Sequence, residues 1–167
     1  MHNLVKWMIC VIIIIAMILL VAGMYFFHVA QVRDPKANQP DVLRTKTNPL
    51  YQYEHKFLAR DKQTWHETTK DGLKLDAWYV AADKKTNKTA ILAHGWHNNK
   101  TTMAIYGELF HDLGYNVLIP DNRAHGDSQG NIIGYGWLDR RDYSQWLNQI
   151  IETNGKNSDI IMYGMGM

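Results

Sequence analysis

The length, composition and charge of the chain exclude several classes of protein. The chain has 167 residues, of which 46% are hydrophobic and 20% are charged, so it is apolar enough to form a core and unlike a disordered protein. Its 18 lysines and arginines exceed its 16 acidic residues by only two, which gives no basis for the strongly basic face of a nucleic-acid-binding protein. The one cysteine, Cys10, excludes an intrachain disulfide and a cysteine-rich zinc site.

Residues 7–27 form an uncharged apolar segment near the N-terminus, after a short tail of residues 1–6. As a helix this segment would cover roughly 30 Å, the thickness of the hydrocarbon core of a membrane. It is longer than the roughly 7 to 15 apolar residues of a cleavable signal peptide, and it ends in Tyr25, Phe26 and Phe27 rather than in small residues. We therefore expect an uncleaved signal anchor that crosses the membrane once, contacts lipid through residues 7–27 and buries Cys10 in the bilayer.

The charges that flank this segment bear on its orientation. Lys6 and the amino terminus lie on one side, and four basic residues lie within 20 residues of the other side: Arg33, Lys36, Arg44 and Lys46. Charge counting places the C-terminal part in the cytoplasm. A very short tail before a first helix favours the opposite orientation, and on that ground we expect an extracytoplasmic domain.

The remainder divides into a linker and one small domain. Residues 28–49 are largely polar and contain Pro35, Pro40 and Pro49, which is typical of a spacer. Residues 50–167 have the length of a single domain. The apolar spacing within Leu50 to Arg60 predicts a short helix that docks on this domain.

Alternation and apolar runs predict the strands. Residues 65–69 and 73–81 flank a turn at 70–72, and the alternation of apolar and polar residues in 73–81 predicts an antiparallel hairpin at the edge of a sheet. Three short runs are continuously apolar, which is typical of strands buried on both faces. These runs cover residues 90–93, 116–120 and 159–163.

Two helices are predicted between the three apolar runs. The first is expected to start at Thr101 or Thr102, to end at Gly114 and to bury one stripe, made of Met103, Tyr106, Phe110 and Leu113. The second ends near Asn154 and Gly155, and its stripe is Tyr143, Trp146, Leu147, Ile150 and Ile151. The alternation of strands and helices predicts an α/β fold with a parallel sheet, whose ligand sites lie at the carboxyl ends of the strands.

Each of the three expected strand ends carries a distinctive motif. Residues 94–97 read HGWH, residues 121–130 read DNRAHGDSQG, and residues 164–167 read GMGM. In this order the motifs resemble the α/β-hydrolase superfamily, in particular its membrane-anchored or secreted serine esterase and peptidase-like members. The resemblance covers residues 65–167 and only the N-terminal half of that fold. It implies hydrolysis of esters, thioesters or peptides by acyl transfer, with no cofactor and no metal.

The resemblance also implies roles for individual residues. The backbone N–H groups of Trp96 and Met167 would form the oxyanion hole, because preorganised donors stabilise the tetrahedral oxyanion. The other motif residues would brace the loops of the site, and His97 would lie at the surface or the rim of a pocket. The bracing residues are His94, Gly95, Asp121, Arg123, His125, Gly126, Ser128 and Gly164.

The nucleophile position departs from the family. In the G-x-S-x-G elbow the serine is the nucleophile, whereas here Gly166 occupies that position and has no hydroxyl. In the family, the acid and the histidine of the catalytic triad follow the elbow, at positions that would lie beyond residue 167. We therefore expect this chain to be inactive. We also expect its strand 159–163 to lie at an exposed edge of the sheet. A small-molecule or peptide acyl substrate is expected only for a full-length form. The alternative is a truncated, non-catalytic membrane protein or a gene remnant.

The sequence also allows three other hypotheses about the site and the fold. Residues 126–130 also read as G-x-S-x-G, which would make Ser128 a nucleophile and His125 its base, but this motif lacks the strand-turn-helix context of an elbow. A zinc site could use His94, His97, Asp121 and His125, although no third ligand is defined by spacing. A nucleotide-binding sheet of the Rossmann type is the main rival fold, but no G-x-G-x-x-G follows the first parallel strand.

Overall fold

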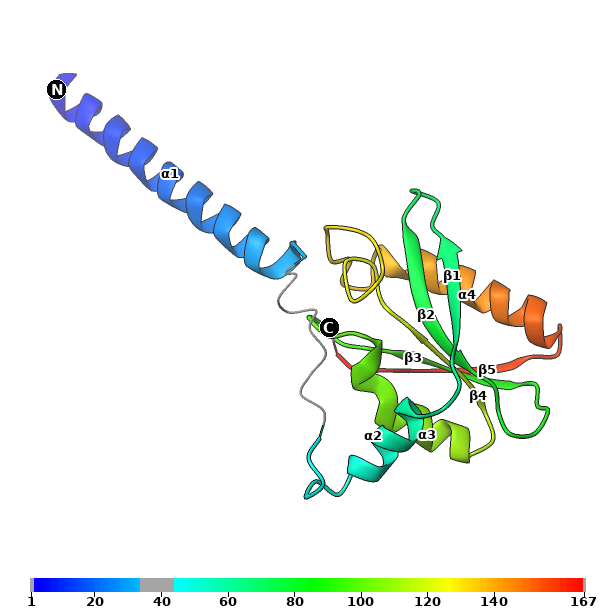
Figure 1. Ribbon diagram of the computed structural model, residues 1–167. Helices are drawn as coiled ribbons and strands as arrows, with labels where there is room; N and C mark the ends of the chain where they lie inside the picture. Colours follow the sequence, from blue (N-terminus) through cyan, green and yellow to red (C-terminus); the bar gives the residue numbers. More distant parts are fainter. Residues whose placement is uncertain (1, 34–43, 167) are drawn as a thin grey trace. The chain divides into compact units, whose positions relative to one another are not determined.

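The computed structural model describes residues 2–33 and 44–166 (Figure 1). Part of the expected linker, residues 34–43, and the expected oxyanion donor Met167 lie outside the described residues. The chain divides into two compact units, Met1–Val32 and Arg33–Met167, which are considered separately below.

The first unit is one long helix, α1 (His2–Gln31), which extends beyond the uncharged segment at both ends. None of its 30 residues is buried, and its most apolar stretch of 18 residues has a mean hydropathy of 3.0. The helix is therefore long and apolar enough to cross a membrane, a criterion that a signal sequence near the N-terminus also meets.

The second unit contains a five-stranded sheet that begins with the predicted hairpin. Strands β1 (Gln63–Thr68) and β2 (Lys74–Val80) pair antiparallel, with Trp65 opposite Ala77. The turn between them includes Gly72 at a φ of +84°, a conformation that favours glycine. Leu75, Ala77 and Tyr79 are buried, as the alternation in the sequence predicts.

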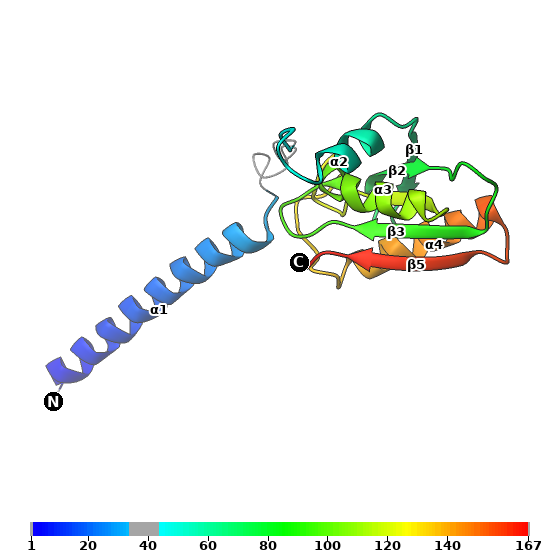
Figure 2. The ribbon, with the colours of Figure 1, turned by 90° about the horizontal axis from the view of Figure 1, so that it is seen from below.

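The three apolar runs are the parallel strands of the sheet. They form β3 (Lys88–Ala93), β4 (Asn116–Pro120) and β5 (Asp159–Gly164), and the strand order is β1-β2-β4-β3-β5. Strand β3 pairs parallel with both β4 and β5, whereas β2 pairs antiparallel with β4. Strand β5 lies at the edge of this sheet beside β3 (Figure 2), and its Met162 is 54% exposed.

Helices cover both faces of the sheet and create two apolar clusters. Helix α2 (Tyr51–Leu58), the 3-10 turn η1 (Lys100–Met103) and α3 (Ala104–Asp112) pack on one face, and α4 (Asp139–Asn154) packs on the other. The first cluster consists of Phe57, Val80, Ala90, Leu92, Met103, Ala104, Val117 and Ile119. The second consists of Trp65, Leu75, Ala77, Tyr79, Ile91, Leu118, Trp146 and Ile150. This confirms the predicted α/β architecture.

Two details of the first predicted helix are wrong. The cap is not Thr101 or Thr102 but Asn99, whose side chain accepts a hydrogen bond from the Thr101 N–H at 2.9 Å. Leu113 is not buried: the helix ends at Asp112, and the Leu113 side chain is 62% exposed. Asn99 lies just before Thr101 and Thr102, and all three are residue types that commonly cap helices, so the sequence alone does not identify the cap.

Helix α2 docks on α3, as the sequence predicts. The ring of Phe57 lies against Gly107, where a Cβ atom would come within 2.6 Å of it, so the two helices can approach closely only with glycine at this position. Arg60 donates two 2.7 Å hydrogen bonds to the carboxylate of Glu108, which is fully buried. Burial alone would raise the pKa of Glu108, but Arg60 and Lys56 lower it to about 2.

The interface between β1 and α4 contains a carboxyl group without a hydrogen-bond partner. Both carboxyl oxygens of Glu67 are buried and unpartnered, and so is Oε1 of Gln145 on α4, whose Nε2 donates to the neighbouring Thr68 carbonyl. Burial, with a smaller contribution from Asp142, raises the pKa of Glu67 to about 8. The folded domain therefore favours the protonated form of this side chain.

We predict that Glu67→Gln stabilises the protein at alkaline pH. The folded-state pKa of about 8 lies above the ordinary value of 4.5, so the stability contributed by this group falls as the pH rises from about 4.5 to 8. The neutral amide avoids burying a charge, and we expect it to raise the free energy of unfolding by about 1–3 kcal/mol at pH 9 and by much less at pH 5. Urea denaturation at both pH values measures this. The exposed change Glu152→Gln on α4 is the control, and equal gains at pH 5 and pH 9 would contradict the prediction.

Candidate functional site

Three loops meet at the carboxyl ends of the parallel strands. Residues 94–98 follow β3, residues 121–130 follow β4, and residues 165–166 follow β5. A Cβ atom on Gly95 would lie 2.6 Å from the carbonyl oxygen of Gly166, so the two backbones are in direct contact and only glycine fits at position 95. The Met165 N–H donates to the Ala93 carbonyl at 3.0 Å and continues the sheet up to this contact.

The first loop is a tight turn. The Asn98 N–H donates to the Gly95 carbonyl at 3.3 Å, and His97 has a φ of +54°, which is uncommon for a residue other than glycine. The ring of Trp96 stacks on that of His97 with 3.8 Å between centroids and remains 38% exposed. Trp96, whose N–H is the expected oxyanion donor, therefore directly follows Gly95, the residue that contacts the backbone of Gly166.

Two buried imidazoles join the first loop to the second. His94 Nδ1–H donates to the Gly95 carbonyl at 2.8 Å, and its Nε2 accepts from the Asn122 N–H at 3.0 Å. His125 Nδ1–H donates to the Arg123 carbonyl at 2.9 Å, and its Nε2 accepts from the His97 N–H at 3.2 Å. Each ring therefore belongs to one loop and accepts a backbone hydrogen bond from the other.

These hydrogen bonds require neutral imidazoles. Burial lowers the pKa of His94 to about 4 and also lowers the pKa of His125. Both ring nitrogens of each histidine are used in hydrogen bonds, so neither ring offers a free nitrogen to a substrate. The structural role that we expected for His94 agrees with this geometry, and His125 is arranged in the same way.

A buried lysine in η1 links β2 and the second loop around Asp121. Lys100 Nζ donates to Asp121 at 2.7 Å and to Asp127 at 2.6 Å, and also to Asp76 on β2. The backbone N–H of Lys100 donates to Asp121 as well, at 2.7 Å. Burial alone would lower the pKa of Lys100, but Asp121, Asp127 and Asp76 raise it above its ordinary value, so the side chain carries its charge.

The Asp121 carboxylate also explains a glycine of the second loop. It accepts the Asp127 N–H at 2.8 Å, and Gly126, at a φ of +49°, lies so close that a Cβ atom there would come within 2.1 Å of it. Any other residue at position 126 would displace the carboxylate from Lys100. The glycine of the HG pair in this motif is therefore needed for packing around an ion pair.

Arg123 braces the other side of the second loop. Its guanidinium forms two hydrogen bonds with Asp142 on α4, at 2.7 and 2.8 Å, and two with Asp71 in the hairpin turn, at 3.0 and 3.3 Å. The hydrogen bond from Arg123 lowers the pKa of Asp71 to about 2. The loop is thereby attached to both the hairpin and α4.

Ser128 is buried and fully engaged. Its hydroxyl donates to the Asp121 carbonyl at 2.7 Å and accepts the Asp76 N–H at 2.9 Å, and the residue is 1% exposed. Residues 126–130 lie in a loop rather than between a strand and a helix. This environment leaves the hydroxyl no open path to a substrate and does not favour the hypothesis that Ser128 is a nucleophile.

The zinc hypothesis is not favoured either. The nearest approach between His94 Nε2 and Asp121 is 4.0 Å, and the nitrogens of His94 and His125 are used in hydrogen bonds within the protein. Within residues 2–33 and 44–166, the carboxylate cluster nearest this site is Asp76, Asp121 and Asp127. The Lys100 ammonium already occupies the centre of that cluster, where a metal ion would bind.

The remaining motif residues lie at the end of β5. Gly164 is the last residue of the strand, and a Cβ atom there would only touch Ala93. Gly166 is exposed, and a Cβ atom on it would meet nothing within 4 Å. The structure therefore brings the proposed nucleophile position beside the turn of Gly95 and Trp96, but supplies no side chain there.

Three residues of the site are not predicted from the sequence: Lys100, Asp76 and Asp142. No motif contains them, and each is an ordinary charged residue in the sequence. Asp76 stands at a polar position of the alternating strand 73–81, so its identity alone does not indicate a buried ion pair.

We predict that Lys100→Met destabilises the domain by about 3–5 kcal/mol, because removing the ammonium leaves the buried Asp121 carboxylate without its counter-charge. Urea denaturation followed by circular dichroism measures the loss. Lys70→Met, in the exposed hairpin turn, is the matched control and should change stability by less than about 0.5 kcal/mol. A Lys100 variant as stable as the control would disprove the role assigned to the ion pair.

Comparisons with known proteins agree with this architecture. No family model matches the chain. The uncharacterised protein YqkD of Bacillus subtilis (strain 168) is 27% identical over 145 residues, which cover 87% of this chain and 47% of YqkD. The esterase Pf2001 of Pyrococcus furiosus matches with a TM-score of 0.58 and 27% identity, covering 75% of this chain and 48% of the esterase.

A second solved structure supports the same fold. An α/β serine hydrolase homologue from Coxiella burnetii matches with a TM-score of 0.51 and 20% identity over 62% of this chain and 51% of its own. The chain spans about half the length of the relatives it matches. The antiparallel pairing of β2 with β4 also distinguishes the sheet from the parallel Rossmann sheet. The described residues of this chain therefore form a partial α/β-hydrolase fold, and its structural neighbours are hydrolases.

Proposed function

We propose that this protein is a membrane-anchored member of the α/β-hydrolase superfamily that recognises acyl compounds but forms no acyl-enzyme at its elbow. The ancestral chemistry of such a site is hydrolysis of esters, thioesters or peptides by acyl transfer, which needs a nucleophile that Gly166 does not supply. The one observation that carries the proposal is the backbone contact between Gly95 and Gly166. It joins an oxyanion-type turn to an elbow whose nucleophile position has no hydroxyl.

The hydrogen bonds of Ser128, His94 and His125 support the second half of the proposal. Ser128 is buried and uses its hydroxyl in two hydrogen bonds, and the imidazoles of His94 and His125 use both of their nitrogens. A serine nucleophile needs an adjacent base with a free nitrogen. These side chains therefore stabilise the loops rather than carry out chemistry.

The membrane part of the proposal rests on α1. A helix of 30 residues at about 1.5 Å per residue is longer than the roughly 30 Å of hydrocarbon that it must cross. We assign its residues 7–27 to contact with lipid and propose that the domain after it is extracytoplasmic. A protease-protection assay on sealed vesicles distinguishes the two orientations.

We predict that the full chain of 167 residues, purified in detergent and verified by intact mass, is not labelled by a fluorophosphonate probe and does not hydrolyse p-nitrophenyl acetate above a heat-denatured sample. The reason is that Gly166 has no hydroxyl to be phosphonylated. The variant Ser128→Ala should give the same baseline. Turnover by the natural chain that disappears in Ser128→Ala would overturn the proposal.

We also predict that Gly166→Ser is tolerated. A Cβ atom at this position meets no atom within 4 Å, so the free energy of unfolding should change by less than about 0.5 kcal/mol. Gly95→Ser is the matched comparison and should be strongly destabilising, because its Cβ atom would lie 2.6 Å from the Gly166 carbonyl oxygen. Thermal unfolding of both variants measures the difference, and equal effects would show that the two backbones are not in contact.

A further inference from the structure

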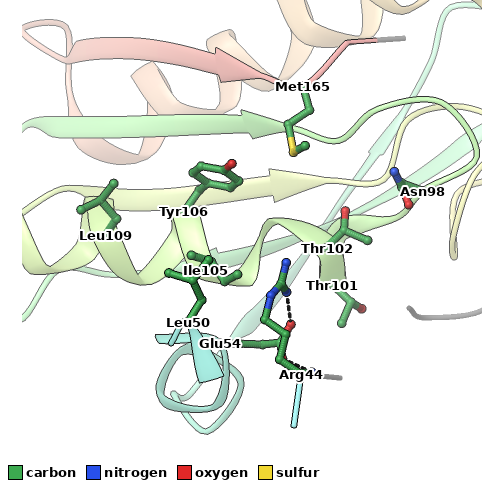
Figure 3. Close-up of a pocket in the computed structure, with 10 residues that line it drawn as sticks. All are labelled: Arg44, Leu50, Glu54, Asn98, Thr101, Thr102, Ile105, Tyr106, Leu109 and Met165. Atoms are coloured by element: carbon green, nitrogen blue, oxygen red, sulfur yellow. Dashed lines mark hydrogen bonds and ion pairs between the residues drawn. The ribbon is translucent and has the colours of Figure 1, made fainter. Parts of the chain in front are cut away.

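Two surfaces of the second unit carry several exposed apolar side chains. The first is a pocket of about 350 Å³ between the segment at Arg44 to Glu54 and the helices η1 and α3, with Leu109 and Met165 in its lining (Figure 3). Its charges are paired, because Arg44 Nη1 donates to the Glu54 carboxylate at 2.7 Å. The second surface is the turn of residues 132–138, which contributes no residue to this pocket and directly precedes two exposed arginines. The second surface, unlike the first, therefore suits an anionic partner.

The turn of residues 132–138 presents four large apolar side chains to solvent. Trp137 is 71% exposed, more than any other large apolar side chain described in the second unit. Ile132, Tyr135 and Leu138 are exposed as well. Tryptophan and tyrosine are enriched where a membrane meets water, because their rings are apolar and each carries a polar group that stays hydrated.

The backbone holds this turn in a defined shape. The Asp139 carboxylate accepts the Gly136 N–H at 2.8 Å, and a Cβ atom on Gly134 would lie 2.4 Å from that carboxylate. The Trp137 N–H donates to the Gly134 carbonyl at 3.0 Å. Gly136 has a φ of +81° and Tyr135 a φ of +47°, which is uncommon for a tyrosine. The fold therefore fixes the turn in a form that leaves the Trp137 ring outside the core.

The exposed charge beside the turn is positive. The Arg140 guanidinium lies over the Trp137 ring, 3.6 Å from its centroid, and Arg141 is exposed next to it at the start of α4. The acidic residues of the same helical turn, Asp139 and Asp142, are buried. Aromatic rings next to exposed arginines fit a layer of anionic headgroups with hydrocarbon beneath it.

Arg33, the first residue of the second unit, is bound to the loop that leads into this turn. Its backbone N–H donates to the Asn131 carbonyl at 2.9 Å. Its guanidinium donates to the carbonyls of Gly126 and Ser128, each at 2.6 Å. Arg33 also follows the last residue of α1, Gln31, by only two positions, which span at most about 7 Å. Chain connectivity thus keeps the start of the turn close to the end of α1.

This short connection sets how far the turn can lie from a membrane. If residues 7–27 occupy the hydrocarbon, as proposed above, residues 28–31 add about 6 Å of helix. Arg33 and its partner Asn131 then lie within about 13 Å of the hydrocarbon. The headgroup layer of a bilayer is itself about 5–8 Å thick on each side. The side chains of residues 132–138 are therefore within reach of that layer.

We infer that the turn of residues 132–138 docks on the anionic lipid headgroups of the membrane that holds α1. Trp137 enters the interface, and Arg140 and Arg141 contact lipid phosphates. The inference rests on the proposed function, because it takes α1 as the anchor, and it adds a second contact with the membrane. Since the turn directly follows residues 121–130, this contact holds the candidate site at the level of the headgroups.

The test measures the depth of single labels on the full chain in phospholipid vesicles. Cys10→Ser removes the one native cysteine, and a fluorescent NBD label is attached to a new cysteine at one position at a time. Lipids with a nitroxide near the top of the acyl chain quench labels that enter the membrane. The vesicles contain phosphatidylcholine alone, or with about 30% phosphatidylglycerol as the anionic lipid.

Three label positions separate the turn from the anchor. Leu138→Cys reports on the turn, and Ile14→Cys reports on α1. Leu113→Cys is the matched control, because Leu113 is an exposed leucine that precedes β4, at the opposite end of that strand from residues 121–130. We expect the label at position 138 to be quenched at least about threefold more than the label at position 113, and more strongly with phosphatidylglycerol.

Substitutions next to the label identify the side chains that bind lipid. Trp137→Ser should abolish most of the quenching at position 138, whereas Trp137→Phe, which keeps an aromatic ring, should retain it. Arg140→Gln combined with Arg141→Gln should remove the effect of phosphatidylglycerol. Ile151→Ser, at an exposed apolar position near the other end of α4, is the control and should change nothing. Circular dichroism verifies that each variant is folded.

The outcomes distinguish this inference from the proposed anchor. Quenching at position 14 together with equal, weak quenching at positions 138 and 113 would overturn the inference and leave the anchor standing. A label at position 14 without quenching would instead overturn the anchor. Shielding at position 138 that rises with the protein-to-lipid ratio, without quenching by the nitroxide lipid, would place a second copy of the chain on the turn and also overturn the inference. Strong quenching at positions 14 and 138, lost at position 138 in Trp137→Ser, supports both.

Discussion

The ion pair between Lys100 and Asp121 is the interaction on which the loops of this domain depend. A lysine buried at 3% exposure is costly unless its charge is compensated, and here one carboxylate from β2 and two from the second loop surround it. The same Asp121 carboxylate accepts two backbone N–H groups and requires glycine at position 126. One charge pair thus sets where the loops after β3 and β4 can lie.

The two buried histidines complete this arrangement with neutral hydrogen bonds. His94 and His125 each accept a backbone N–H from the opposite loop, so the turn after β3 and the loop after β4 behave as one unit. Their lowered pKa values follow from the same burial that makes the hydrogen bonds effective. A rigid support of this kind is what an oxyanion turn needs, because its donors must be held in place before charge develops.

The hydrogen-bonded loops after β3 and β4 are in place, but the residue at the nucleophile position, Gly166, has no hydroxyl. Gly166 lies against Gly95, and a Cβ atom on Gly166 would meet nothing within 4 Å. Under the function proposed above, the site would hold an acyl compound without forming an acyl-enzyme at Gly166. The chain thus shares its fold with the esterase Pf2001 and carries glycine at its own elbow.

The sequence by itself determined the α/β architecture, the hairpin, the three parallel strands and the glycine at the elbow, because these depend on local periodicity and on residue identity. It did not predict that Asn99 caps the turn before α3, that Leu113 is exposed, or that Lys100 and Asp142 hold the loops. Nor did it locate the pocket lined by Leu109 and Met165. These features join residues that are far apart in the chain, such as Lys100 with Asp76 and Arg123 with Asp71, and no pattern of spacing encodes such pairs. Only the packing of the strands and helices brings their charges within hydrogen-bond distance, where burial makes each pairing obligatory.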